Sequence, residues 1–209
     1  MNSLDQSESQ PVPHGIKQVV FDEDAIALRV GELASEVDRD YRDKKPVLVC
    51  ILDGGFHFAQ ALSRQLSIPA RLDSIRLTRY DQRSETGAAR VVQDLREDIR
   101  GEDVLLIGDI VDTGLSLNYL VQILLERDPA TLRVCTLLDR ADLRLVRLPI
   151  GYVGFKVNDE FLVGYGLNYR GHYRDLPYLA TLDLHAAQTD LAGDEVSREF
   201  GSIEEARPW

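Results

Sequence analysis

The feature that most constrains the fold is an apolar run that ends in two aspartates and opens directly into a helix. Residues 104–107 read Val-Leu-Leu-Ile, which is typical of a strand buried on both faces. Asp109 and Asp112 follow at its carboxyl end, and the turn at 113–116 leads into an apolar stretch with helical spacing. Because ligands of open α/β sheets bind beyond the carboxyl ends of the strands, this segment predicts a binding site.

The turn after these aspartates suits a phosphate group. Free amides at the start of the helix, together with the hydroxyls of Thr113 and Ser116, form a cradle for an anion, and Gly114 lets the backbone approach it closely. An alternative is that Asp112 and Thr113 only cap the helix. The letters Asp-Thr-Gly-x-Ser also occur in aspartic proteases, which pair two such aspartates on an all-β scaffold. Here a helix follows and the sequence holds no second copy, so we reject that alternative.

The rest of the chain alternates short apolar runs with helical patterns. Such an order favours an α/β fold with a mostly parallel sheet. Residues 91–95 are expected to return as the hairpin partner of 71–77. The expected strands are 47–52, 71–77, 91–95, 104–107, 132–138 and 152–157, and the expected helices are 22–41, 56–66 and 115–127.

Composition narrows the class of protein. The net charge of −11 over 209 residues argues against a nucleic-acid binder, which needs a basic face. We expect no membrane span, since no apolar run approaches the ~20 residues of a membrane helix. Cys50 and Cys135 lie in short apolar runs and are expected to be buried free thiols. The polar start lacks a signal-peptide pattern, so we expect a cytoplasmic protein. We expect a disordered arm over 1–14, one domain over 15–184 and an acidic flexible tail over 185–209.

The segment 104–116 resembles the signature of type I phosphoribosyltransferases that binds phosphoribosyl pyrophosphate (PRPP), and the resemblance extends over about 16–183. It implies the type I phosphoribosyltransferase fold: a mostly parallel central sheet flanked by helices, with a small hood region and a flexible catalytic loop. It also implies that the turn holds the 5′-phosphate, that Asp109 binds the ribose hydroxyls and that Asp112 is the general base near N7 of a purine. The chain departs from the family at Gly108, where most relatives carry an acid. The implied PRPP-binding residues are Asp53, Gly54, Gly55, Asp109, Ile110, Asp112, Thr113, Gly114, Leu115, Ser116 and Arg174.

Two further segments resemble loops of the same family. Residues 52–55, Leu-Asp-Gly-Gly, are similar to the pyrophosphate loop, which usually reads Leu-Lys-Gly-Gly with a non-proline cis peptide before its second residue. Asp53 replaces the lysine. Residues 78–80 are similar to the start of the flexible catalytic loop, with Tyr80 retained and Arg79 in place of a serine. Such a lid excludes water from the reacting centre. A plain turn and an ordinary hairpin tip are the alternatives for the two segments.

The base pocket is implied by two stretches. Residues 137–140 resemble Leu-Leu-Asp-Lys, whose lysine reads O6 of hypoxanthine or guanine; Arg140 replaces it here and is not equivalent in shape. Residues 161–169 resemble Phe-Val-Val-Gly-Tyr-x-Leu-Asp-Tyr, so that Phe161 would stack on the purine and the Leu162 backbone would read its Watson–Crick edge. Asn168 replaces an aspartate that helps to anchor a metal. Arg174 matches an arginine that clamps pyrophosphate. Without the resemblance, these residues are a surface arginine and a strand with core aromatics.

Together the landmarks imply a phosphoribosyltransferase of the hypoxanthine–guanine type. It would use Mg²⁺, held in part by Asp109 and Asn168, to form IMP or GMP and pyrophosphate from PRPP and a 6-oxopurine. The implied catalytic residues are Asp112, Asp109, Arg174 and Tyr80, and the family implies a homodimer or homotetramer. The departures at Asp53, Gly108, Arg140 and Asn168 leave open a PRPP- or nucleotide-binding regulator with weak or no activity. Arg140 also leaves open a transferase for another base, such as xanthine or a pyrimidine.

Overall fold

The computed structural model describes residues 13–79 and 89–188, which build two sheets. The larger one has six strands in the order β4-β3-β2-β5-β6-β7. Only β4, the hairpin partner of β3, runs antiparallel. The predicted mostly parallel α/β sheet is therefore confirmed. The strands are β2 (Val47–Leu52), β3 (Arg71–Arg79), β4 (Ala89–Gln93), β5 (Asp103–Val111), β6 (Thr131–Asp139) and β7 (Ile150–Lys156).

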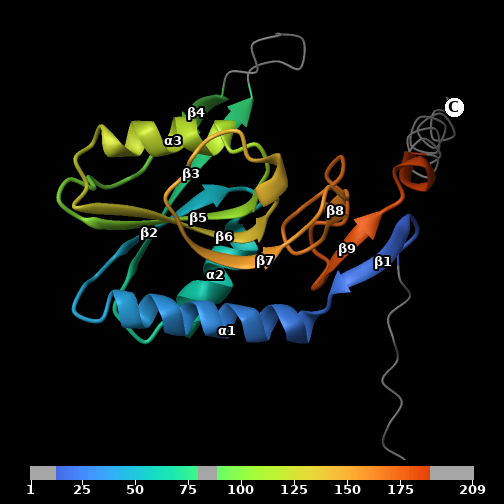
Figure 1. Cartoon of the computed structure of the whole chain (residues 1–209), viewed down its shortest axis with the longest axis horizontal. Coiled ribbons are helices and arrows are strands. Elements are labelled where there is room, and N and C mark those ends of the chain that lie inside the picture. The colour runs from blue at the N-terminus through green and yellow to red at the C-terminus, as the bar shows by residue number, and fades with distance from the viewer. Residues whose placement is uncertain (1–12, 80–88, 189–209) are drawn as a thin grey trace, which may run out of the picture.

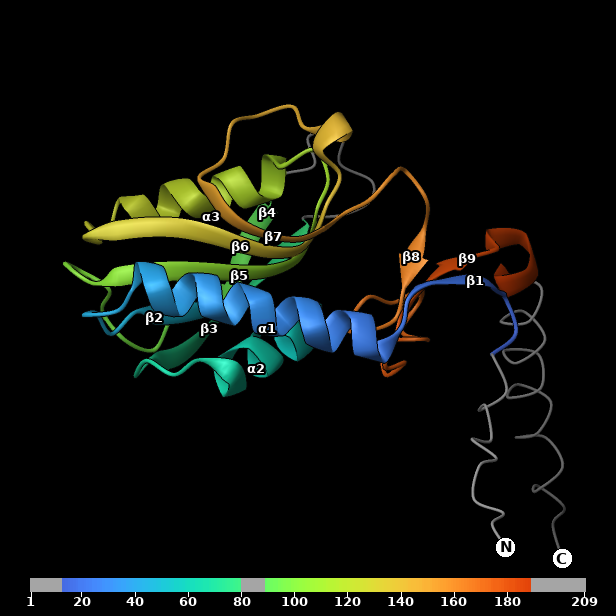
Figure 2. The ribbon, with the colours of Figure 1, turned by 60° about the horizontal axis from the view of Figure 1, so that its bottom comes forward.

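Three helices cover the two faces of this sheet. Helices α1 (Glu23–Asp40) and α2 (Phe56–Gln65) pack on one face, and α3 (Leu115–Leu125) packs on the other (Figures 1 and 2). Helix α1 begins where its sequence predicts, because the carboxylate of Asp22 accepts a hydrogen bond from the amide of Ala25 at 2.8 Å. All three helices therefore lie close to the positions expected from apolar spacing.

The sheet divides the core into two apolar layers. Alternate residues of the central strands point to opposite faces, so Leu48 and Cys50 pack under α1 and α2 while Val47 and Val49 pack under α3. Cys50 and Cys135 are buried free thiols, as expected from their apolar flanks. Burial raises the pKa of Cys50 to about 12, so its thiol stays protonated at neutral pH.

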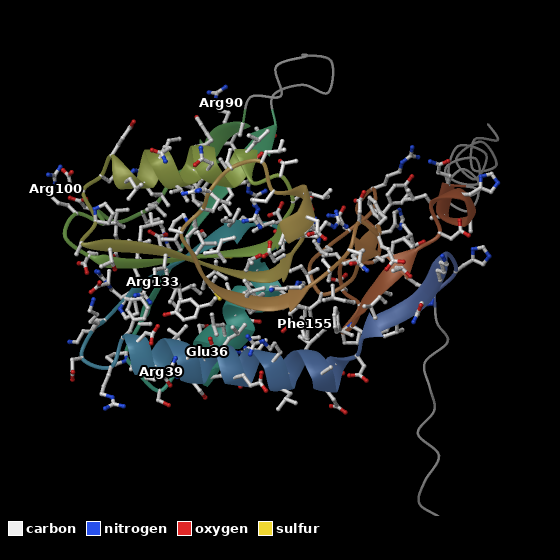
Figure 3. The ribbon with its side chains drawn as sticks, viewed as in Figure 1. Glu36, Arg39, Arg90, Arg100, Arg133 and Phe155 are labelled. Carbon is white, nitrogen blue, oxygen red and sulfur yellow. The ribbon has the colours of Figure 1, made fainter. Side chains whose placement is uncertain are left out.

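A second, antiparallel sheet of three short strands forms the hood, in the order β1-β9-β8. Its strands are β1 (Ile16–Phe21), β8 (Leu162–Val163) and β9 (Leu179–Leu182). Strand order along the chain does not reveal this sheet, because β1 pairs with β9, which lies at the other end of the domain. Phe155 of β7 stacks on Phe21 with ring centroids 3.9 Å apart and thereby ties the hood to the main sheet (Figure 3).

The structure describes the ends of the chain, and the segment expected to be the catalytic loop, only in part. Residues 185–188, which the sequence assigns to the tail, belong to a helical turn whose Ala187 is buried against the hood. The rest of the tail, the arm before residue 13 and the segment 80–88 with Tyr80 lie outside the described residues. Within the described ranges, no helix is both long enough and apolar enough to cross a membrane.

Candidate active site

The candidate site lies where the carboxyl ends of the parallel strands meet the hood (Figures 1 and 2). Gly166, in the loop after β8, packs so closely on the carbonyl of Gly54 that a Cβ there would overlap it. Arg140, just after β6, reaches the hood segment by donating to the carbonyl of Glu160. Loops that follow β2, β5, β6 and β8 therefore converge at the carboxyl edge of the main sheet, where the resemblance implies the binding crevice.

Asp109 lies deeper than its sequence position suggests. Strand β5 continues to Val111, because its pairing with β6 persists through Val111 opposite Asp139, so Asp109 is part of the strand rather than of the following loop. Its carboxylate lies directly against the backbone of Gly54, and a Cβ at that position would overlap it. The peptide bond between Leu52 and Asp53 is cis, as the resemblance implied. A glycine at 54 is what allows this loop and this carboxylate to pack together.

The pKa of Asp109 is raised above its ordinary value, and the cause is local. Burial of the carboxylate is the largest contribution, and the nearby charge of Asp112 acts in the same direction. The amides of Ile110 and of Asp109 itself, together with the charge of Arg174, lower the pKa but do not outweigh burial. Asp109 is partly exposed, but the nearby amides and Arg174 do not fully compensate the negative charge of its carboxylate. Such perturbed groups in a crevice are typical of functional sites.

Asp112 faces an arginine rather than the end of the helix. Nη1 of Arg140 donates to Oδ1 of Asp112 at 2.9 Å. The same guanidinium donates from Nε to the carbonyl of Asn158 at 3.1 Å and from Nη2 to that of Glu160. At the start of α3 the acceptor for the amide of Leu115 is the Thr113 hydroxyl, whereas the carboxylate of Asp112 is bound to Arg140. Of the two residues in the capping alternative, only Thr113 therefore contacts the helix end in this way.

Arg140 thus connects Asp112 to the segment just before β8, and its donors already have protein partners. Reading O6 of a base would require it to exchange one of them. A second arginine, Arg144, was not expected from the sequence. Its Nε donates to the backbone carbonyl of Asp112 at 3.3 Å, and its Nη2 pairs with the buried carboxylate of Asp139. The only sequence signal was a basic residue five positions after a strand-terminal aspartate, which is too common to assign.

The turn at 113–116 has the backbone that an anion site needs. Gly114 has φ of +80°, a conformation that favours glycine, and a Cβ there would approach Leu148 to 2.9 Å. The hydroxyl of Thr113 accepts a 3.4 Å hydrogen bond from the amide of Leu115, and Leu115 itself is exposed. The first-turn amides of a helix have no partner within the helix, so this turn presents donors at the crevice.

The opposite wall of the crevice is strand β8. The amide of Leu182 donates to the carbonyl of Phe161 at 2.9 Å, and Leu162 is paired with Thr181. Antiparallel pairs alternate between hydrogen-bonded and non-hydrogen-bonded, so the N–H and C=O of Leu162 point away from β9. Since β8 is an edge strand, these groups face outward from the sheet. The side chain of Phe161 is partly exposed and meets Tyr169 edge to face, with centroids 5.6 Å apart.

Asn168 and Arg174 lie in the loops that follow β8. The side-chain oxygen of Asn168 accepts a 2.9 Å hydrogen bond from the amide of Gly171 and so closes a turn. The carbonyl of Arg174 accepts from the amide of Gly166 at 3.0 Å, and Gly166 packs on Gly54, so the backbone of Arg174 is held near the loop at 53–55. Within the described part of the chain, His, Cys, Asp and Glu residues form no group of three or more that could hold a metal ion.

Comparison with known proteins agrees with this geometry. The model of the phosphoribosyl transferase domain matches residues 19–170. The hypoxanthine-guanine phosphoribosyltransferase of Mycobacterium avium is 39% identical over 178 residues, covering 82% of this chain and 88% of that protein. The hypoxanthine phosphoribosyltransferase of Salmonella typhimurium is 39% identical over 170 residues, covering 80% and 96%.

Solved structures give the same result. The hypoxanthine phosphoribosyltransferase of Trypanosoma cruzi in complex with the product IMP superposes with a TM-score of 0.79 at 32% identity, covering 84% of this chain and 99% of that one. A hypoxanthine-guanine phosphoribosyltransferase from Bacillus anthracis gives a TM-score of 0.74 at 35% identity, covering 80% and 98%. The fold, the converging loops and these likenesses lead to one conclusion: the chain belongs to the phosphoribosyltransferase family, among its hypoxanthine-guanine phosphoribosyltransferases.

Proposed function

We propose that this crevice transfers the phosphoribosyl group of PRPP to hypoxanthine or guanine, forming IMP or GMP and releasing pyrophosphate. The proposal rests on one observation: the site has two sides with different chemistry, which we call its walls. One wall holds Asp109, Asp112 and an amide-rich turn that suits a sugar phosphate. The other is the free backbone edge of Leu162 beside Phe161, which suits a flat base. The relatives carry names that describe this reaction.

PRPP would lie along the first wall. The turn over 113–116 would receive the 5′-phosphate, because its amides and hydroxyls are donors at the positive end of α3. Asp109 would accept hydrogen bonds from the ribose hydroxyls. Its raised pKa supports this role, since two hydroxyl donors would stabilise the charged carboxylate that burial now disfavours. The loop of Asp53, Gly54 and Gly55 would meet the pyrophosphate together with Arg174.

The base would lie along the second wall. Hypoxanthine and guanine each present a ring N–H next to a carbonyl, and the backbone of Leu162 offers one acceptor and one donor on the same edge. Phe161 would stack on the ring. Arg140 would contribute by exchanging its bond to the Glu160 carbonyl for the base oxygen.

The reaction needs positioning and charge more than covalent catalysis. A ring nitrogen of the base forms a bond to C1 of the ribose while the bond from C1 to pyrophosphate breaks, and the pyrophosphate leaves with the electron pair. Positive charge develops on the ribose, and nearby carboxylates stabilise it. Asp112 would accept the proton that the purine loses at N7, which requires its carboxylate to exchange Arg140 for the base.

Mg²⁺ is proposed as part of the bound substrate. The candidate protein oxygens are the Asp109 carboxylate and the Asn168 side chain, and the latter already accepts from Gly171. So small a donor set fits Mg²⁺, which usually keeps several waters and is held by one or two carboxylates plus substrate phosphates. When bound, the ion would neutralise charge on the departing pyrophosphate.

The direct test is a radiometric assay with PRPP, Mg²⁺ and a panel of hypoxanthine, guanine, xanthine and uracil, with PRPP omitted as the control. We expect nucleotide formation with hypoxanthine or guanine. PRPP binding by calorimetry without turnover of any base would replace the proposal with a regulator. Faster turnover of xanthine or uracil would assign the chain to another base.

Assembly and location stay predictions. The family implies a homodimer or homotetramer, which sedimentation of the purified protein would check. The cytoplasmic location rests on the amino-acid sequence alone.

A further inference from the structure

Asp53 and Arg76 form a two-point ion pair at the pyrophosphate loop. Nη2 of Arg76 lies 2.8 Å from Oδ1 of Asp53, and Nη1 donates to Oδ2 at 3.2 Å. Both side chains are nearly half exposed, at 42% and 47%. Neither residue belongs to the hydrophobic core, so packing does not account for the pair. Asp53 also occupies the position at which the resembling loops carry a lysine.

The register of the main sheet places this pair at the site. Arg76 of β3 is paired with Leu52, the last residue of β2, so it reaches the carboxyl edge of the sheet. The next residue, Asp53, starts the loop whose Gly54 packs on the Asp109 carboxylate. Arg76 therefore contacts the residue that directly precedes Gly54 and Gly55, the two glycines of the loop that is proposed to bind pyrophosphate.

Charge balance at this edge favours a binding role for Arg76. Asp53, Asp109 and Asp112 all lie at the crevice, and a pyrophosphate group would be repelled by an uncompensated acid. Arg140 and Arg144 already donate to protein carboxylates and carbonyls. Among the described residues, Arg76 contacts Asp53 through its two terminal nitrogens, and a guanidinium carries further N–H donors.

The pair is also weak enough to rearrange. Exposed ion pairs contribute typically ~0–1 kcal/mol, so a phosphate group can take over part of the arginine at little cost. The planar fork of arginine suits phosphate oxygens better than a lysine point charge does. Asp53 would hold the fork at the loop until the ligand arrives.

We propose that Arg76, positioned by Asp53, binds the pyrophosphate group of PRPP in this chain and supplies the positive charge that the loop itself lacks. The proposal rests on the function proposed above. It makes Arg76 a binding residue and Asp53 a positioning residue.

The test is steady-state kinetics of Arg76→Gln with PRPP as the varied substrate, together with inhibition by inorganic pyrophosphate. Losing one charged donor fork is expected to raise the KM for PRPP about tenfold or more and to weaken pyrophosphate inhibition by a similar factor. The KM for hypoxanthine should change less than twofold, because the base lies on the other wall. The double variant Asp53→Lys with Arg76→Gln returns a cation to the loop and should recover most of the lost affinity for PRPP.

Arg71→Gln is the matched control. Arg71 lies on the same strand, is 47% exposed and pairs with Glu97 at 3.0 Å and Glu102 at 2.8 Å, but it is at the amino end. Its variant should keep the wild-type KM for PRPP. An unchanged KM in Arg76→Gln, or an equal rise in Arg71→Gln, overturns the inference while leaving the proposed function intact. A wild-type protein that converts no base would instead count against the proposed function.

Discussion

Asp73, near the amino end of the main sheet, and Asp109, near its carboxyl end, have pKa values that are shifted in opposite directions. At the amino end, burial opposes ionisation of Asp73, but the amides of Ser74, Arg96 and Glu97 and the Arg96 side chain outweigh it, so the pKa of Asp73 is lowered. Asp103, at the start of β5, follows the same pattern with Lys44 and Thr131 as donors. Arg100 and Arg133 mark this end of the molecule in Figure 3. At the carboxyl end, burial outweighs the nearby amide donors and the charge of Arg174, so the pKa of Asp109 is raised.

The difference indicates that the carboxylate of Asp73 is compensated by protein donors, whereas that of Asp109 is not. Where a carboxylate exists for stability, the chain supplies its donors from nearby backbone and side chains. Asp109 has the amides of Ile110 and of Asp109 itself as donors, and they do not outweigh burial; the proposed function leaves further donors to the ribose hydroxyls. Functional sites commonly sacrifice some stability in this way.

The largest expected effect concerns Asp112. Asp112→Ala should slow nucleotide formation by roughly 10²–10⁴-fold, the usual contribution of a general base, while thermal unfolding and PRPP binding change little. The fold should survive because the Asp112 side chain is 41% exposed. The measurement is kcat with hypoxanthine at saturating PRPP.

Asp142→Ala serves as the control for this variant, since Asp142 is an exposed aspartate on a one-turn 3-10 helix (Ala141–Leu143) that follows β6. It should turn over at the wild-type rate. Equal rates for Asp112→Ala and wild type would remove the assignment of the base.

The next largest effect concerns the amino end. The Asp73 side chain is 5% exposed, and Asp73→Ala would leave its amide donors without a partner, which should lower the free energy of unfolding by about 2–3 kcal/mol. Urea unfolding at pH 7 measures this loss. Because the folded-state pKa is lowered, the contribution of Asp73 is present above its ordinary pKa and should disappear as the pH falls through the folded-state value.

Glu97→Ala is the control at this end. Glu97 also pairs with an arginine, but its side chain is 60% exposed, so the loss should stay below about 1 kcal/mol. Similar losses for the two variants would show that burial does not distinguish them.

The smallest expected effect has the opposite sign. Asp109→Asn should raise the free energy of unfolding of the ligand-free protein at neutral pH. The rise should be smaller than the loss expected for Asp73→Ala. The pKa of Asp109 is higher in the folded state than in the unfolded state. Between these two pKa values the folded state binds more protons, so the free energy of unfolding of the wild type falls as the pH rises. The gain of the asparagine variant should therefore grow from pH 4 to pH 8, and urea unfolding across this range measures it. A constant difference, or a less stable variant at pH 8, would contradict the comparison.

Local pattern was enough to predict the helices and the core strands. Apolar spacing and the acid at residue 22 located α1, and unbroken apolar runs located β2 and β5. Strand ends were harder, because β5 runs on to Val111 only through its pairing with β6. The hood strands β1 and β9 escaped prediction since each gains its partner from the far end of the domain.

Residue type and spacing in the sequence by themselves predicted a phosphate-binding turn with Asp109, Asp112 and Gly114, and the resemblance to the family added the aromatic segment around Phe161. The tertiary structure alone decided their partners. Arg140 meets Asp112, Arg76 meets Asp53 and the backbone of Leu162 faces an open edge only because of which strands and loops lie side by side. Periodicity encodes the contacts within one element, whereas ion pairs and free edges depend on neighbours that folding brings from elsewhere in the chain.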